Sequence, residues 1–133
     1  MNIKAVIKNL VNSKGISGNE NSVCETALNL LKEYCPDAYI KNGNVIGKFG
    51  SFKENRPHIL LDAHIDQVGM IVTYITDDGF IKVGNVGGLD RRLLPAQQVT
   101  IHGEKDIKGI ICSVPPHLTK GKSAVLKIEE VSI

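Results

Sequence analysis

Three polar side chains alternate with apolar ones in the segment ILLDAHIDQVGMIV, which covers residues 59–72. They are Asp62, His64 and Asp66, one at every second position. Residues two apart along a β-strand lie on the same face of the sheet, so an extended segment would bring these three groups together. This pattern fits three interpretations. The residues could form a buried cluster whose polar groups are all hydrogen-bonded, a chance grouping at the end of a strand, or part of a metal site.

His64 follows the best candidate for a buried strand, residues 58–63. In open α/β sheets, ligands bind beyond the carboxyl ends of the strands. A neutral imidazole at such a place can bind a metal, and a carboxylate that accepts its other N–H fixes the tautomer. Asp66 suits this role, although on a straight strand the two side chains start roughly 7 Å apart. Contact between them therefore predicts that the strand ends just after His64.

Two weaker interpretations use the same residues. The His-x-Asp pattern is common by chance. Without context, surface residues or hydrogen-bonded core residues are favoured over a metal site by roughly three to one. A glycosidase pair formed by Asp62 and Asp66 would be about 13 Å apart on a strand, whereas paired glycosidase carboxylates lie roughly 5–9.5 Å apart. Asp62 is instead expected to be buried beside His64, with a backbone or helix-capping hydrogen bond.

The composition is that of an ordinary globular domain. The chain has 133 residues, 42% of them hydrophobic, and a net charge of +2 from interspersed basic and acidic residues. No basic stripe indicates a nucleic-acid or membrane partner, no apolar run approaches the roughly 20 residues of a membrane helix, and the N-terminus lacks a signal-peptide pattern. The three cysteines, an odd number without C-x-x-C spacing, indicate reduced thiols and a cytoplasmic protein.

The elements that must position His64 begin with two helices. Apolar periodicity predicts amphipathic helices over residues 2–13 and 20–34, the second capped by Ser17 or Asn19. The Asn42-Gly43 pair then predicts a β-hairpin. Together with the buried strand over residues 58–63, these elements predict an α/β layer.

After Gly69 the sequence pattern predicts β-strands and no helices. MIVTYI and FIKVGNV flank one turn, and QQVTIHG and KGIICSV flank another, so two further hairpins are expected. The alternating segment AVLKIEEVSI, residues 124–133, predicts a closing strand. Short strands at regular spacing without helices between them are typical of a small barrel or sandwich.

Four motifs in this order carry a resemblance to a known family: GISGNE (15–20), LLDAHIDQVGMIV (60–72), DDGFIKVGNVGGLDRRLLPAQQVTIHG (77–103) and KGIICSVPPHL (108–118). Together they closely resemble the dinuclear-zinc aminopeptidases, a family of glutamyl aminopeptidases and tetrahedral, dodecameric aminopeptidases in which some members are labelled cellulases or endoglucanases. The resemblance implies the start of a metallopeptidase α/β domain, residues 1–69, followed by part of an inserted β-barrel domain for oligomerisation, residues 70–133.

The resemblance also implies a function. The chain would be the N-terminal portion of an enzyme that hydrolyses N-terminal residues from peptides through metal-activated water, as a homo-oligomer between dimer and dodecamer. His64 would be a metal ligand and Asp66 the carboxylate that orients it, while Gln67 stands where the family often has Glu. The complete enzyme would hold two divalent metal ions, zinc first, with cobalt or manganese as alternatives.

The remaining ligands and the general base follow the barrel in this family, so the chain is expected to be cut off and inactive alone. The Glu129-Glu130 pair resembles a catalytic Glu-Glu motif, but its place in an alternating strand favours ordinary solvated charges. The alternatives to an enzyme fragment are a non-catalytic oligomerisation module, a decayed gene fragment and, third, a glycoside hydrolase. Six other polar residues are expected to be structural or to lie at subunit contacts: His58, Asp90, Arg91, Arg92, His102 and His117.

Overall fold

The computed structural model describes residues 2–51, 53, 55–112 and 125–133. The chain divides into two compact units, Met1–Gln67 and Val68–Ile133, and each is described by itself. The assignment of these units to a catalytic and an oligomerisation domain stays a prediction. Among the described residues, no helix has the length and apolar content required to cross a membrane.

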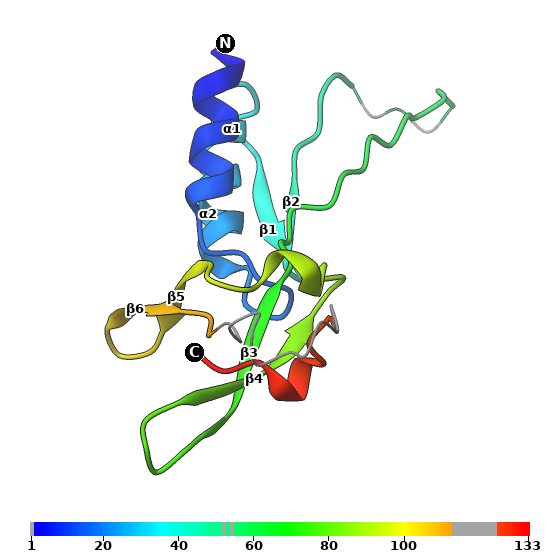
Figure 1. The fold of residues 1–133 in the computed structure, drawn as a ribbon. Coiled ribbons are helices and arrows are strands. Elements are labelled where there is room, and N and C mark those ends of the chain that lie inside the picture. Colours follow the sequence, from blue (N-terminus) through cyan, green and yellow to red (C-terminus); the bar gives the residue numbers. More distant parts are fainter. Residues whose placement is uncertain (1, 52, 54, 113–124) are drawn as a thin grey trace. The chain divides into compact units, whose positions relative to one another are not determined.

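The first unit contains two helices and a hairpin, as predicted (Figure 1). The elements are α1 (Ile3–Asn12), α2 (Asn21–Lys32), β1 (Tyr39–Lys41) and β2 (Asn44–Ile46). Asn2 caps α1, since its side chain accepts a hydrogen bond from the N–H of Ala5 at 3.2 Å. The predicted cap of α2 by Ser17 or Asn19 is wrong, because Glu20 occupies the N-cap position and makes no side-chain capping bond.

The helices α1 and α2 run antiparallel in this unit. Residues at the start of α1 share a groove with residues at the end of α2, and Ser13 Oγ lies 2.8 Å from Thr26 Oγ1 at the other end. The small core of the unit comprises Val23 and Cys24 of α2 with Cys35 and Ala38, all of them buried. The β1–β2 turn places Asn42 and Gly43 at positive φ, 52° and 74°, as a type I′ hairpin turn requires.

The predicted buried strand over residues 58–63 is wrong. The described residues between β2 and Gln67 form no helix or strand, and they extend away from β2 before returning (Figure 1). Ile59, Leu60 and Leu61 are 88%, 87% and 90% exposed. A strand needs neighbours to pair with its backbone groups, and none of the described strands pairs with this segment.

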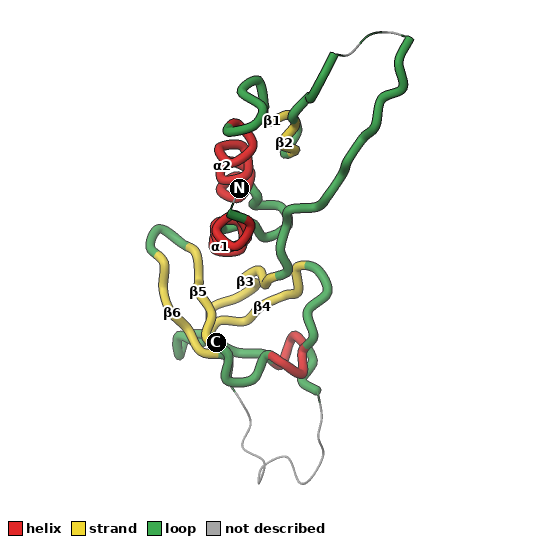
Figure 2. The backbone as a smooth tube through the Cα atoms, turned by 90° about the horizontal axis from the view of Figure 1, so that it is seen from above, coloured by secondary structure: helices red, strands yellow, loops and turns green. Residues whose placement is uncertain are grey.

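The second unit contains the two predicted hairpins. Strands β3 (Gly69–Ile75) and β4 (Ile81–Val86) form one antiparallel pair, and β5 (Gln98–His102) and β6 (Asp106–Ile110) form the other. The 3₁₀ helix η1 (Arg91–Leu93) lies between the two hairpins in the chain. In Figure 2 the strands of both hairpins are drawn in yellow.

The predicted closing strand over residues 124–133 is wrong. Its described part forms a 3₁₀ helix, η3 (Ile128–Glu130), because the Glu130 carboxylate accepts a hydrogen bond from the N–H of Lys127 at 2.7 Å and closes the turn. Only Ser132 forms a bridge, with Lys82 of β4. The chain end thereby contributes Val131, fully buried, to a core with Val83, Leu94 and Ile111.

Each sheet in the described part of the chain has two strands. The structure is therefore a small α/β piece followed by β-hairpins. A closed barrel is not shown by the described residues, and the predicted barrel stays a prediction.

Candidate metal-ligand site

The candidate site lies in the first unit, where the loop after α1 meets the end of the extended segment. The N–H of Gln67 donates to the carbonyl oxygen of Gly15 at 2.7 Å, and Ile16 forms a parallel β-bridge with Gln67. These backbone contacts hold residues 15–17 beside residues 66 and 67. Two segments about fifty positions apart in sequence are thereby brought together.

Asp66 is the centre of a hydrogen-bonded group of three side chains. Ser17 Oγ donates to Asp66 Oδ2, and His64 Nδ1 lies 3.1 Å from Asp66 Oδ1. The predicted contact between His64 and Asp66 is confirmed. The segment that carries both residues forms no strand, so their side chains are not held apart at the spacing of a straight strand.

These contacts determine where the protons of the group lie. The hydroxyl of Ser17, and then the imidazole of His64, hold the pKa of Asp66 below its ordinary value, so the carboxylate is ionised at neutral pH. An ionised carboxylate only accepts hydrogen bonds. Ser17 therefore donates to it, and the contact with His64 requires the imidazole to donate through an Nδ1–H. The lone pair of His64 is left on Nε2, which is the arrangement of a metal-binding histidine held by a carboxylate.

Gly15 allows the loop to approach α2. The residue is buried, and a Cβ atom built on it would lie 2.5 Å from Cγ1 and 2.9 Å from Cβ of Val23. Val23 is itself only 1% exposed, so it has little room to move. The first glycine of the GISGNE motif is thus required by close packing.

We expect Gly15→Ala to lower the free energy of unfolding by about 1–3 kcal/mol, the usual cost of overpacking a core. Urea unfolding measures this change. Gly88→Ala is the matched control, because a Cβ at Gly88 meets nothing within 4 Å and the residue does not have positive φ. Equal stability of the two variants would show that the loop is not packed as described.

Gln67 connects this site to the end of α1. Its Nε2 lies 3.4 Å from the carbonyl oxygen of Leu10 and 3.5 Å from that of Ser13, and it donates to both. Carbonyl groups at the end of a helix carry partial negative charge. An amide donates to them, whereas an ionised glutamate at this position would be repelled.

Gln67→Glu is therefore expected to reduce the free energy of unfolding at pH 7 by about 0.5–1.5 kcal/mol, the value of a typical hydrogen bond. The folded state disfavours the charged form of the new side chain, so its pKa would be raised above the ordinary value. The loss should accordingly diminish as the pH falls toward about 4 and the glutamate is protonated. Thermal unfolding at both pH values tests this, with Gln97→Glu, at an exposed position, as control.

The structure places the other predicted residues outside this group. Asp62 is exposed, so the expectation that it is buried is wrong, because the segment that carries it is not a buried strand. His102 Nδ1 lies 2.9 Å from Asp106 Oδ1 at the end of the β5–β6 hairpin. His58 is exposed, and His117 lies outside the described residues.

Charged residues of the second unit have local partners. Asp90 caps η1 through the N–H of Arg92 and also binds the Arg92 guanidinium, with Nη2–Oδ2 at 2.6 Å and Nε–Oδ1 at 2.9 Å. This guanidinium holds the pKa of Asp90 below its ordinary value. Glu129 and Glu130 are exposed in η3, where Glu130 bonds the backbone of Lys127. These contacts are structural.

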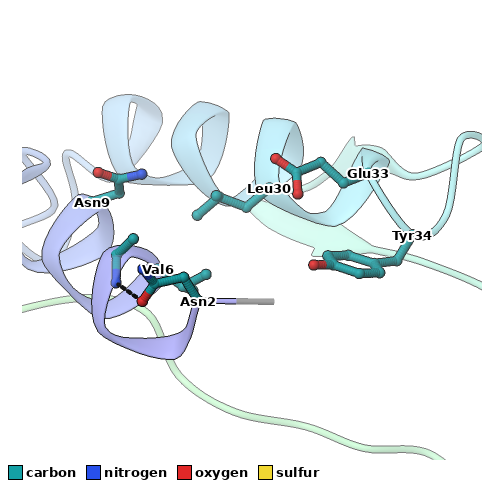
Figure 3. Close-up of a pocket in the computed structure, with 7 residues that line it drawn as sticks. Asn2, Val6, Asn9, Leu30, Glu33 and Tyr34 are labelled. Carbon is teal, nitrogen blue, oxygen red and sulfur yellow. Dashed lines mark hydrogen bonds between the residues drawn. The ribbon is translucent and has the colours of Figure 1, made fainter.

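A shallow groove of about 370 Å³ lies between α1 and α2 (Figure 3). Val6 and Leu30 face it, with Asn2, Asn9 and Glu33 at its edges. None of its lining residues belongs to the group formed by Ser17, His64 and Asp66. The groove is a gap between helices and offers no arrangement of groups for catalysis.

Ser17 is the site residue that sequence reasoning missed, since it was expected to cap α2. Its partner Asp66 is 49 positions away. Neither periodicity nor spacing relates two residues at that separation. The only available signal was that both residues occur in segments resembling one enzyme family.

Comparison with known proteins gives a consistent result. The profile of the M42 glutamyl aminopeptidase family matches residues 43–133. Lysyl aminopeptidase of Pyrococcus furiosus is 32% identical over 118 residues, which cover 86% of this chain and 33% of that protein.

Solved structures agree with the sequence matches. An aminopeptidase from the archaeon Desulfurococcus kamchatkensis has a TM-score of 0.84 at 30% identity, over 96% of this chain and 36% of its own. The TET1 peptidase of Pyrococcus horikoshii, which can assemble into a tetrahedron or a large octahedral shell, has a TM-score of 0.80 at 30% identity over 97% of this chain and 39% of its own.

The present chain thus spans between 33% and 39% of the length of these relatives. The family match nevertheless covers well over half of the chain, and it includes His64 and Asp66. The chain therefore belongs to the M42 glutamyl aminopeptidase family.

Proposed function

We propose that this chain supplies the first metal ligand of a metal-dependent aminopeptidase, which removes N-terminal residues from peptides. The observation that carries the proposal is the hydrogen-bonded group in which Asp66 accepts from both Ser17 and His64. It leaves Nε2 of His64 available on a side chain that is 87% exposed. The membership in an aminopeptidase family supplies the reaction class.

The donor set fits one corner of a metal site. An imidazole that gives its Nδ1–H to a carboxylate is the usual form of a metal-binding histidine. Within the described ranges, no group of three or more His, Cys, Asp or Glu side chains could hold a metal ion. A catalytic zinc takes about three protein ligands, so the chain alone is expected to be inactive or nearly so.

Each residue of the site has a distinct part in this proposal. His64 would bind the metal through Nε2, and Asp66 would orient the imidazole and keep its proton on Nδ1. The loop at Gly15 would hold the segment in place through the N–H of Gln67. When bound, a divalent metal polarises the substrate carbonyl and makes water a stronger nucleophile.

The complete enzyme would hold two divalent metal ions, form a homo-oligomer and be located in the cytoplasm. Two divalent ions, zinc before cobalt or manganese, suit an imidazole ligand in this family. A homo-oligomer is supported by the Pyrococcus horikoshii relative, which can assemble into a tetrahedron or a large octahedral shell. The second unit would form the contacts between subunits. Three free cysteines favour the reducing cytoplasm.

A chimera tests the proposal. Residues 1–133 replace the matching third of the Desulfurococcus kamchatkensis aminopeptidase, which supplies the remainder of the chain. We expect the chimera to release N-terminal amino acids from short peptides, to lose this activity on chelation and to regain it with zinc. The parent enzyme is the positive control, and the 133-residue chain alone is expected to show no activity.

Two outcomes would contradict the proposal. A chimera that folds and assembles like the parent but hydrolyses no peptide would show that this chain does not supply a working site. Ordinary aminopeptidase turnover by the 133-residue chain alone would show that the ligand assignment is wrong.

A further inference from the structure

Ser17 is the half-buried member of the group around Asp66 that comes from the loop after α1. Its hydroxyl donates to Oδ2 of Asp66, while His64 occupies Oδ1. We propose that Ser17 is a positioning residue, whose hydroxyl fixes the Asp66 carboxylate so that His64 keeps its proton on Nδ1 and presents Nε2. The role of Nε2 in metal binding rests on the proposed function. The effect of Ser17 on the proton of His64 does not depend on it.

The imidazole of His64 depends on hydrogen bonding for its orientation. Its side chain is 87% exposed, so packing contributes little to holding the ring. Asp66 is 39% exposed, and within the described part of the chain its side-chain hydrogen-bond partners are Ser17 and His64. A carboxylate held at one oxygen only could rotate about its last bond, and the Nδ1 contact would then compete with water. A second hydrogen bond at Oδ2 fixes the plane of the carboxylate.

Ser17 is able to serve as an anchor because its loop is fixed on both sides. Gly15 is packed against Val23 and bonds the backbone of Gln67, next to Asp66. On the other side, the N–H of Gly18 donates to a carboxylate oxygen of Glu20 at 2.6 Å. The hydroxyl therefore comes from a loop whose neighbouring residues are held by packing and hydrogen bonds, which is the support that a preorganised site requires.

The test uses nitrogen NMR of the His64 ring in the metal-free 133-residue chain at about pH 8, where histidines are usually neutral. We expect the wild type to show predominantly the Nδ1–H tautomer. Ser17→Ala should shift His64 toward the tautomer mixture of a solvent-exposed histidine. Ser17→Thr, which retains a hydroxyl, should restore the wild-type spectrum.

Ser13→Ala is the matched control for general effects of losing a hydroxyl in this unit. Ser13 Oγ bonds the carbonyl of Asn9 and contacts Thr26, and its side chain does not touch Asp66. We expect this variant to leave the His64 tautomer unchanged, and backbone amide spectra verify that each variant is folded.

An unchanged His64 tautomer in folded Ser17→Ala would overturn the proposal, as would a wild type in which Nε2–H predominates. Failure of Ser17→Thr to restore the spectrum would also overturn it. This measurement is independent of peptidase activity. An inactive chimera with the expected tautomer shifts would reject the proposed function and leave the role of Ser17 standing.

Discussion

His64→Ala in the chimera is expected to abolish metal-dependent release of N-terminal residues. The substitution removes a direct metal ligand, so its effect should exceed the roughly 10–100-fold loss that follows when an outer partner of a ligand is removed. Rates on a short peptide at saturating zinc measure the effect. Because the side chain is 87% exposed, the free energy of unfolding should change little.

His102→Ala is the matched control for this variant. His102 makes the same kind of contact as His64, with Nδ1 2.9 Å from a carboxylate oxygen of Asp106. It lies at the end of the β5–β6 hairpin, and its replacement should leave activity near that of the unaltered chimera. Equal losses in the two variants would contradict the assignment of His64.

Asp66→Asn is expected to weaken zinc binding by roughly 10–100-fold. An amide offers one oxygen that accepts and one nitrogen that donates, so it can no longer accept from both Ser17 and His64. If the nitrogen faces His64, Nδ1 must become the acceptor and the proton moves to Nε2, where it blocks the metal. Zinc affinity of the chimera, measured against a competing chelator, tests this expectation.

Asp106→Asn provides the comparison for the Asp66 variant, because it alters the carboxylate beside His102 in the same way. Its zinc affinity should equal that of the unaltered chimera. Retention of full affinity by Asp66→Asn would show that the carboxylate does not control the tautomer of His64.

Local signals in the sequence predicted the local elements well. Periodic apolar residues predicted α1 and α2, and the Asn42-Gly43 pair predicted the first hairpin, whose turn residues have the required positive φ. The contact between His64 and Asp66 was also predicted, although the segment that carries both residues forms no strand. Each of these signals lies within a few residues of the feature that it predicts.

Features that depend on distant partners were predicted poorly. The apolar run over residues 58–63 was expected to be a buried strand, yet burial requires neighbouring strands, and Ile59 is 88% exposed. The alternation in residues 124–133 was expected to form a strand, but its described part contains a helical turn, formed by backbone bonds and by the bond from the Lys127 N–H to the Glu130 carboxylate. The Ser17–Asp66 bond joins residues 49 positions apart and leaves no pattern in the sequence.

The position of the metal relative to His64 tests the central claim most directly. Anomalous diffraction at the zinc edge, from crystals of the zinc-loaded chimera, would locate the ion. We expect zinc about 2.0–2.1 Å from Nε2 of His64, with Nδ1 still bonded to Asp66. Zinc bound elsewhere with His64 uncoordinated, or bound through Nδ1 with the Asp66 contact broken, would contradict the account.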